Sequence, residues 1–315
     1  YSDILYFTIR LILHAYKILK MRNFMMQQWR DLTVRKIEEA KVLISGIAYD
    51  LSCSCGQGTG FAPNKLRELS QFLPPATKDG ESITKMKIYD FGDIGNNDLG
   101  IDKVELKALE ILQYDKFPIF IGGDHSVSIP IQKAFYEYYR KQNKIPAIIH
   151  IDAHPDFCDI YDNSKYSHAC TNFRAYENGY CLEDIVLLGI RGFELQEIEL
   201  FKKHPEINIY RASLLNEKGM KVINELINKF DERYAIYLSF DIDAIDPSFA
   251  PGTGTPEAFG LSTTMTNEII NYFIKNLPVK AMDVVEVAPP LDVNDVTSWT
   301  ALKIIYEVLN TLQQR

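Results

Sequence analysis

From residue 42 onward, short apolar runs alternate with longer amphipathic stretches, and this alternation most constrains the fold. Near-continuous apolar runs bounded by turn residues are typical of strands that are buried on both faces. The strand–helix–strand order predicts an α/β fold with a mostly parallel central sheet and helices on both of its faces. The predicted strands span residues 42–48, 86–90, 118–121, 147–151, 185–188, 207–210, 235–240 and 281–287.

No Pro- or Ser-rich linker and no internal repeat interrupts this pattern, so we predict a single domain over residues 24–315. Residues 1–23 are apolar but contain five charged side chains, and no apolar stretch there reaches the about 18 residues of a membrane span. We interpret residues 1–23 as an N-terminal extension of uncertain role.

The predicted helices span residues 103–112, 128–142, 195–202, 218–230 and 266–275.

The charge and cysteine content narrow the possible partners and compartments. A net charge of −8 and a pI of about 5.4 argue against nucleic acid and anionic membrane surfaces as partners. The five cysteines are odd in number and form no CxxC motif, which argues against a disulfide framework and against a cysteine zinc site. Free thiols are typical of a reducing compartment, so we predict a cytoplasmic protein.

Four polar clusters lie at the carboxyl ends of predicted strands: GGDHS at 122–126, DAHPD at 152–156 and DID at 241–243 each follow a strand, and Glu286 lies at the end of one. In open α/β sheets, ligands bind beyond the carboxyl ends of the strands. We therefore expect these clusters to converge on one site, although they lie far apart in the sequence. Each cluster alone would be read as an ordinary turn or cap.

The first three clusters supply four carboxylates and two imidazoles without a thiolate. Such a set favours a hard or borderline divalent ion such as Mn²⁺ over a structural zinc. It is too large for one ion, so we expect two ions that share Asp152 and Asp241 and lower the pKa of a bridging water. Four aspartates, two divalent ions and one bridging hydroxide together have a net charge of −1, which suits a cationic substrate. The spacing of two is expected to place alternate side chains on one side of an extended segment. The predicted ligands are His125, Asp152, His154, Asp156, Asp241 and Asp243.

Three further side chains are candidates for other roles near such a centre. His168, in the sequence SHAC, is placed to carry a proton to a leaving amine, and the alternative is an exposed loop histidine. Glu286 lies among apolar residues and suits bidentate binding of a planar cation, and the alternative is a structural ion pair. His150 precedes the end of its strand and is predicted to hydrogen-bond to a group that supports a ligand.

Two Gly-rich stretches do not match nucleotide-binding motifs. PGTGTPE at 251–257 lacks a following Lys-Ser/Thr, and we interpret it as a rigid loop that supports the DID turn. GQGTG at 56–60 does not match GxGxxG, and we interpret it as a loop on the substrate side.

In this order, GGDHS, DAHPD, SFDIDAIDPSFAPGTGTPE and MDVVEVAPP resemble the ureohydrolases, the family of arginase, agmatinase and formiminoglutamase. The resemblance covers roughly residues 42–310. It implies a three-layer α/β/α sandwich, two Mn²⁺ ions per subunit, and attack of a metal-bridging hydroxide on the guanidinium or amidino carbon of a small substrate. It also implies a homo-oligomer, either a trimer or a hexamer.

The same resemblance implies a role for each matching residue. One manganese would be held by His125, Asp152, Asp156 and Asp241, and the other by Asp152, His154, Asp241 and Asp243. His168 resembles the histidine that shuttles protons, and Glu286 resembles the residue that grips the guanidinium group. The predicted catalytic residues are therefore His168, Glu286 and Asp156.

KYSHAC at 165–170, followed by Arg174, is similar to the agmatinase branch, which hydrolyses agmatine to putrescine and urea. The loop at 53–60 and Ala48 depart from that branch, where Arg-Pro-Gly-Ala-Arg and Pro are typical. Another guanidino-acid or formimino hydrolase, such as guanidinobutyrase, arginase or formiminoglutamase, would use the same core. Two other classes are a two-metal phosphoester hydrolase and a non-catalytic binding protein. The motifs have no cluster of Lys or Arg nearby to hold a phosphate, which argues against the phosphoester hydrolase. No predicted metal ligand is missing, which argues against the non-catalytic protein.

Overall fold

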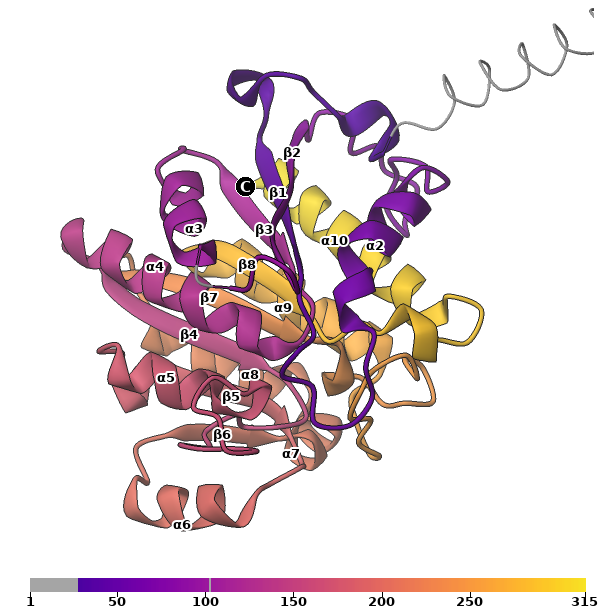
Figure 1. Cartoon of the computed structure of the whole chain (residues 1–315). Helices are drawn as coiled ribbons and strands as arrows, with labels where there is room; N and C mark the ends of the chain where they lie inside the picture. The colour runs from indigo at the N-terminus through magenta and orange to yellow at the C-terminus, as the bar shows by residue number, and fades with distance from the viewer. Residues whose placement is uncertain (1–27, 102) are drawn as a thin grey trace, which may run out of the picture.

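The computed structural model describes residues 28–101 and 103–315, so the predicted N-terminal extension at 1–23 lies outside the described residues. Within this part of the chain, one sheet of eight parallel strands runs in the order β2-β1-β3-β8-β7-β4-β5-β6 (Figure 1). The predicted α/β fold with a parallel central sheet is confirmed. The strands are β1 (Val42–Ala48), β2 (Ile88–Asn96), β3 (Phe117–Ile121), β4 (Ile145–Ile151), β5 (Ile185–Ile190), β6 (Asn208–Arg211), β7 (Tyr234–Asp241) and β8 (Val279–Val285).

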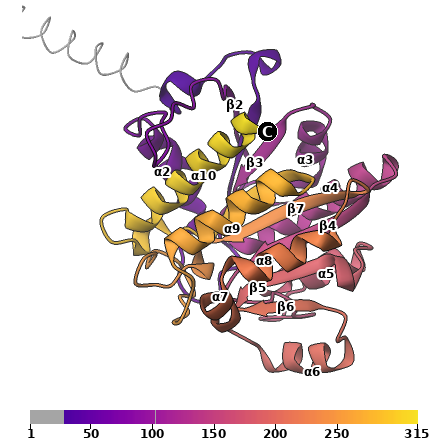
Figure 2. The same cartoon turned by 180° about the vertical axis from the view of Figure 1, so that it is seen from behind.

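Helices cover both faces of the sheet and form the outer layers of an α/β/α sandwich. Figure 1 shows α3, α4 and α5 in front of the sheet, and Figure 2 shows α8, α9 and α10 on the opposite face. In the described part of the chain, no helix is long and apolar enough to cross a membrane. The helices are α2 (Ala62–Ser70), α3 (Val104–Leu112), α4 (Ser128–Lys141), α5 (Thr171–Glu177), α6 (Leu195–Lys203), α7 (Ala212–Lys218), α8 (Met220–Leu226), α9 (Thr263–Asn276) and α10 (Val296–Gln314).

Alternation of side chains along each strand feeds two hydrophobic cores, one on each side of the sheet. In β1, Val42 and Ile44 join the core under α2, α9 and α10, whereas Leu43 and Ile47 join the core under α3 and α4. All four side chains are fully buried. Complete burial of such a side chain contributes about 1.5–3 kcal/mol, which explains why both faces of the central strands are apolar.

The helix predicted over residues 218–230 is confirmed as α8 and the 3-10 helix Ile227–Lys229 that continues it, but the prediction missed the preceding helix α7. The chain breaks at Gly219, which has φ 55° and ψ −142°, and two short helices, α7 and α8, meet there. A residue with a Cβ adopts this conformation only with strain, so glycine sets the break. Strand β2 is also displaced toward the C-terminus relative to the prediction of 86–90, and it continues to Asn96.

Four neighbouring strands in the middle of the sheet carry the polar clusters. In space, β3, β8, β7 and β4 follow one another. GGDHS follows β3, Glu286 follows β8, Asp241 ends β7, and Asp152 follows β4. Because all four strands are parallel, their carboxyl ends meet at one edge. The strand order therefore explains how segments that are distant in the sequence form a single site.

Candidate metal centre and pocket

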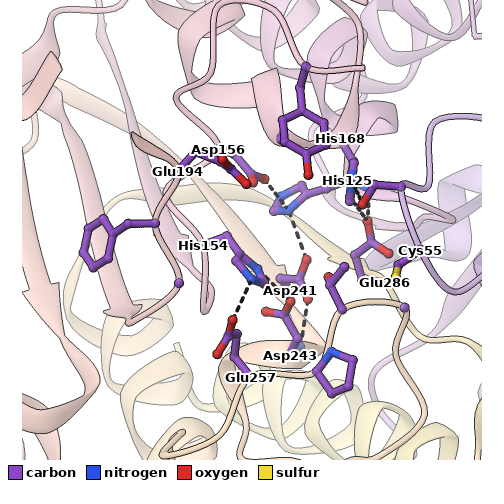
Figure 3. Close-up of a pocket in the computed structure, with 18 of the residues that line it drawn as sticks. Cys55, His125, His154, Asp156, His168, Glu194, Asp241, Asp243, Glu257 and Glu286 are labelled. Carbon is purple, nitrogen blue, oxygen red and sulfur yellow. Dashed lines mark hydrogen bonds and ion pairs between the residues drawn. The ribbon is translucent and has the colours of Figure 1, made fainter. Parts of the chain in front are cut away.

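His125 lies at the centre of the first group of predicted ligands. Its Nδ1 is 3.0 Å from Asp152 Oδ2 and 3.1 Å from Asp156 Oδ2. It is also 3.1 Å from Asp241 Oδ2. All four side chains are buried. The structure thus brings together the four residues that were expected to hold one ion, and Figure 3 shows three of them, His125, Asp156 and Asp241, in the pocket.

A second group forms around His154. Its Nδ1 is 3.0 Å from Asp243 Oδ2 and 3.6 Å from Asp152 Oδ1. Asp152 is therefore shared by the two groups, one carboxylate oxygen facing each imidazole. Asp241 contacts this second group through its Oδ1, which accepts a hydrogen bond from the backbone N–H of Asp243 at 2.8 Å.

The expected extended segment does not exist in either motif. Beyond β4 the chain bends at once, since Asp152 Oδ1 accepts from the backbone N–H of His154 at 2.6 Å. Asp156 has a left-handed φ of 52°, which turns its side chain toward His125 while His154 points toward Asp243. Asp243 lies in the short 3-10 helix Ile242–Ala244 that follows β7. The spacing of two therefore distributes ligands between two positions rather than aligning them on one side.

Several polar atoms of these groups fit a metal ion because they lie about 3 Å from one another without the geometry of an ordinary hydrogen bond. They are fully buried, which is costly for a polar atom without a partner. Burial, together with repulsion from Asp243 and Asp152, raises the pKa of Asp241 well above its ordinary value. Crowded carboxylates of this kind are stabilised by a bound cation. The atoms without an ordinary hydrogen bond to a described residue are His125 Nδ1, Asp152 Oδ2 and Asp243 Oδ2.

The protein fixes the orientation of His125 through Nε2, the ring nitrogen that does not face the carboxylates. His125 Nε2 lies 2.9 Å from Ser239 Oγ, and Ser239 Oγ donates to Asp283 Oδ1 at 2.9 Å. Since the serine proton goes to the carboxylate, the serine oxygen accepts from the imidazole N–H. Nδ1 of His125 then carries the lone pair and points at the carboxylates, as a metal ligand requires.

His150 lies within the first group, and its ring counts with His125, Asp152 and Asp156 among the side chains that could hold an ion. Its Nε2 lies 2.9 Å from Asp152 Oδ2, but its hydrogen bond goes to the carbonyl oxygen of His154 at 3.0 Å. A nitrogen that donates its proton to a carbonyl has no lone pair for a metal. His150 also stacks on the ring of His125, with centroids 4.8 Å apart. The supporting role of His150 stays a prediction.

His168 and Glu286 lie side by side at the other side of the pocket. His168 Nδ1 is 3.2 Å from Glu286 Oε1, and the same oxygen accepts from the backbone N–H of His125 at 2.8 Å. Burial opposes the charged form of His168, but the hydrogen bond to Glu286 outweighs it and raises the pKa of His168 to about 9. Glu286 has a left-handed φ of 62°, a strained conformation for a non-glycine residue.

A serine that was not predicted completes the surroundings of His168. Ser54 Oγ lies 3.0 Å from His168 Nε2, and Ser54 also hydrogen-bonds to Tyr161. Ser54 belongs to the loop at 53–60, which departs from the agmatinase pattern. In that loop, the backbone N–H of Gly56 donates to the carbonyl oxygen of Gly254 at 3.3 Å. The two Gly-rich loops of the sequence therefore meet beside the site.

A pocket of about 390 Å³ opens above the two ligand groups (Figure 3). None of the described residues that line it is Lys or Arg, whereas Glu194, Glu197 and Glu257 line it beside the predicted ligands. These three glutamates were also missed by the sequence reasoning. Glu194 and Glu197 follow β5, the neighbour of β4, so the rule about carboxyl ends of strands could have found them.

Arg191 connects PGTGTPE to the DID turn. Its Nη2 donates to the carbonyl oxygens of Asp243 and Glu257, each at 2.7 Å. Its Nε donates to the carbonyl oxygen of Ala258 at 2.9 Å. One half-buried guanidinium fork thus holds two segments in a fixed relation, which agrees with our interpretation of 251–257 as a supporting loop.

Comparison with known proteins agrees with this fold and site. Residues 40–310 match the model of the arginase family. An agmatinase from Bacillus cereus is 35% identical over 281 residues, which cover 86% of this chain and 92% of that protein. A guanidinobutyrase from Pseudomonas aeruginosa is 31% identical over 283 residues, which cover 85% of each protein. The crystal structure of the agmatine ureohydrolase of Thermoplasma volcanium superposes with a TM-score of 0.78 at 28% identity, covering 91% of this chain and 94% of that chain.

The chain belongs to the arginase family. It is a hydrolase of amidino carbon–nitrogen bonds, an agmatinase or a related ureohydrolase. The resemblance that the sequence motifs indicated is therefore confirmed.

Proposed function

We propose that the protein is an agmatinase, which converts agmatine and water to putrescine and urea. The charge of the pocket carries this proposal. Agmatine has a guanidinium group at one end and an ammonium group at the other, and no described Lys or Arg lines the pocket to repel either end. Glu194 and Glu257 line it together with the predicted ligands and suit the second cation. A guanidino acid would instead bring a carboxylate against these glutamates.

We further propose that the two ligand groups hold two Mn²⁺ ions. Carboxylate and imidazole ligands without thiolate suit this ion. The shared position of Asp152 and the contact of Asp241 with both groups support a pair of ions rather than one. When bound, two divalent ions lower the pKa of a shared water, so that hydroxide is available near neutral pH. The assigned ligands are His125, Asp152, His154, Asp156, Asp241 and Asp243.

We assign Glu286 to binding the guanidinium group of the substrate and His168 to protonating the leaving amine. Glu286 Oε1 accepts from His125 N–H and lies beside His168, while no described residue donates to Oε2. Oε2 is therefore available to accept from the guanidinium group. Hydrolysis adds hydroxide to the guanidinium carbon and breaks the bond from that carbon to the alkyl nitrogen. His168 is placed to give that nitrogen the proton with which it leaves as an amine.

A second candidate is hydrolysis of guanidinobutyrate, which is favoured by the 31% identity to a guanidinobutyrase. Both candidates share the centre and differ at the far end of the substrate. The test is urea release from Mn²⁺-loaded protein with agmatine, arginine, guanidinobutyrate and guanidinopropionate, with formamide release from formiminoglutamate as a further arm. We expect agmatine to have the highest kcat/KM. A higher value for guanidinobutyrate would contradict the argument from pocket charge.

Butylguanidine, which lacks the distal ammonium group, separates the role of the glutamates from that of the centre. Glu257→Gln and Glu194→Gln are expected to raise KM for agmatine by about 10- to 100-fold, the value of one charge-assisted contact. The same variants should leave KM for butylguanidine unchanged. Equal effects on both compounds would show that these glutamates do not recognise the second cation.

We also propose a homo-oligomer in the cytoplasm, formed by one catalytic domain over residues 24–315. All five cysteines are unpaired, which suits a reducing compartment. Sedimentation velocity of the purified protein tests the expected trimer or hexamer, and a monomer at micromolar concentration would contradict it.

A further inference from the structure

The opposite edge of the sheet, where the strands begin, holds a second pocket, which we call the basic pocket. Its volume is about 700 Å³, within the range of small-molecule sites. A strand of seven residues spans roughly 23 Å, so the basic pocket is separated from the metal centre by about the length of a strand. Six cationic side chains line it: Lys41, Lys85, Lys116, Lys144, Lys280 and Arg315.

The parallel sheet itself gathers these cations. Lys41, Lys116 and Lys144 directly precede β1, β3 and β4, and Lys280 is the second residue of β8. Because parallel strands begin at the same edge, lysines that are far apart in the sequence become neighbours there. This edge is the counterpart of the acidic edge at which the carboxylates gather.

The positive charge of the basic pocket is not balanced within the described part of the protein. Asp115 is the one side-chain carboxylate among its described lining residues, and none of the six cations forms an ion pair with a described residue. Burial, with repulsion from Arg315 and Lys144, lowers the pKa of Lys280. This concentration of like charge occurs in a chain with a net charge of −8.

Neutral carbonyl groups hold two of these cations in place. Lys144 Nζ donates to the carbonyl oxygen of Glu232 at 2.6 Å. Arg315 donates to the carbonyl oxygens of Val279 at 3.2 Å and Leu277 at 3.0 Å. A carbonyl fixes the position of a cation without cancelling its charge, so the charge remains available to a ligand.

An adjoining hollow of about 330 Å³ extends the same surface. It shares Lys144, Lys280 and Arg315 with the basic pocket and adds Lys275. Its carboxylates are Asp231 and Glu232, and Asp231 is paired with Arg233 at 2.8 Å. Positive charge therefore exceeds negative charge over both hollows together.

Aromatic side chains form part of the wall of the basic pocket. Tyr138 and Tyr139 pack edge to face, with centroids 5.0 Å apart, and Tyr114 and Phe117 also line the pocket. Aromatic rings beside clustered cations suit a ligand that combines a planar ring with several negative charges.

We propose that the basic pocket binds a polyphosphate anion, supplied either as inorganic polyphosphate or as the phosphate chain of a nucleotide. Several phosphate groups are needed to contact cations on four strands, and multiple charge-assisted hydrogen bonds give such a ligand its affinity. This site is independent of the metal centre and of the substrate assigned to it.

The test uses the Mn²⁺-loaded protein and a fluorescent aromatic trisulfonate, pyranine, which chelates metals weakly. We expect its anisotropy to rise on binding at low salt and to fall when the magnesium complexes of triphosphate or ATP displace it. Lys116→Gln with Lys144→Gln should weaken binding at least about tenfold. Lys218→Gln with Lys221→Gln, an equal charge change at exposed positions elsewhere, should change it less than twofold. Tighter displacement by ATP than by triphosphate would show that the aromatic wall takes part.

Lysine acetylation of the wild-type protein provides a second measurement that needs no variant. Triphosphate is expected to protect Lys116, Lys144 and Lys280, but not Lys218 or Lys221, from acetic anhydride. Equal affinity in the two double variants, or uniform protection of all lysines, would overturn the proposal. Displacement of pyranine by agmatine would place its binding in the substrate pocket instead and would also overturn it. A change of oligomeric state in Lys116→Gln with Lys144→Gln, without bound anion, would identify the surface as an interface between copies.

Discussion

Replacing Gly192 with alanine tests how closely the second ligand group depends on its surroundings. A Cβ at this position would lie 2.5 Å from His154 Cδ2 and 2.8 Å from His154 Nε2, whereas ordinary Cβ contacts begin at 3.4 Å. The imidazole must therefore move by about 0.9 Å or rotate away from its rotamer, which costs about 0.5–1.5 kcal/mol. Gly192 does not have a positive φ, so the backbone itself accepts alanine.

The effect should appear in metal binding rather than in folding. His154 is 28% exposed at the pocket, so its ring can swing outward with little loss of packing. Metal–ligand distances tolerate only about 0.2 Å, so a shift of about 0.9 Å removes this ligand. We expect Gly192→Ala to bind one Mn²⁺ tightly and the second at least about 10- to 100-fold more weakly. Turnover should fall at least about 100-fold, since a misplacement of about 1 Å has that effect.

The assay measures the metal content after dialysis by inductively coupled plasma mass spectrometry. The melting temperature is measured in parallel. His154→Ala should reproduce the loss of one metal. Gly80→Ala is the control, because its φ of 82° strains the backbone while no atom lies within 4 Å of the added Cβ. That variant should lose about 1 kcal/mol of stability and keep both metals. Two tightly bound ions and full turnover in Gly192→Ala would refute the reasoning.

Three other perturbations give distinct results. Ser54→Ala removes the hydrogen bond to His168 Nε2 and should lower kcat about 3- to 10-fold while metal content and KM stay unchanged, whereas a loss of metal would show a structural role. Asp283→Asn leaves at least one of the four groups that donate to this buried carboxylate without an acceptor. The free energy of unfolding should therefore fall by about 3 kcal/mol, which thermal unfolding would show. Mn²⁺ binding should also weaken, because Asp283 orients His125 through Ser239, and metal titration would show this loss. In metal-free protein, the pKa of His168 is raised from 6.5 to about 9, so the stabilisation from its pair with Glu286 is complete below about pH 6.5 and is lost as the pH rises through about 9. Glu286→Gln should abolish that part of the pH dependence of the melting temperature, and an unchanged pH profile would contradict the assignment.

The sequence predicted the layers and the edge that carries the site, because both follow from local patterns. Apolar runs mark strands that are buried on both faces, and polar residues directly after them must lie at the carboxyl edge. The order of β3, β8, β7 and β4 could not be derived this way, since it depends on pairing between segments that are distant in the sequence. The assignment of ligands to two separate groups could not be predicted either, because the spacing of the residues does not reveal the left-handed backbone of Asp156.

The residues around the ligands were harder to predict than the ligands themselves. Ser54 reaches His168 only because its loop crosses the open edge of the sheet. Glu194 and Glu197 belong to a helix start that reads as an ordinary capping box, and both halves of that box are present. Local capping chemistry thus gave these glutamates a sufficient structural explanation and concealed their position in the pocket.

The contact between Gly56 and Gly254 has a consequence for the divergence of substrate preference. A Cβ on Gly254 would lie 2.6 Å from the carbonyl oxygen of Gly56, and a Cβ on Gly56 would lie 2.9 Å from Gly254 Cα. Neither loop can therefore acquire a side chain at this point while the other keeps its path. A lineage that changes specificity here must alter both loops together, and an engineer who transplants one loop from a relative must transplant its partner as well.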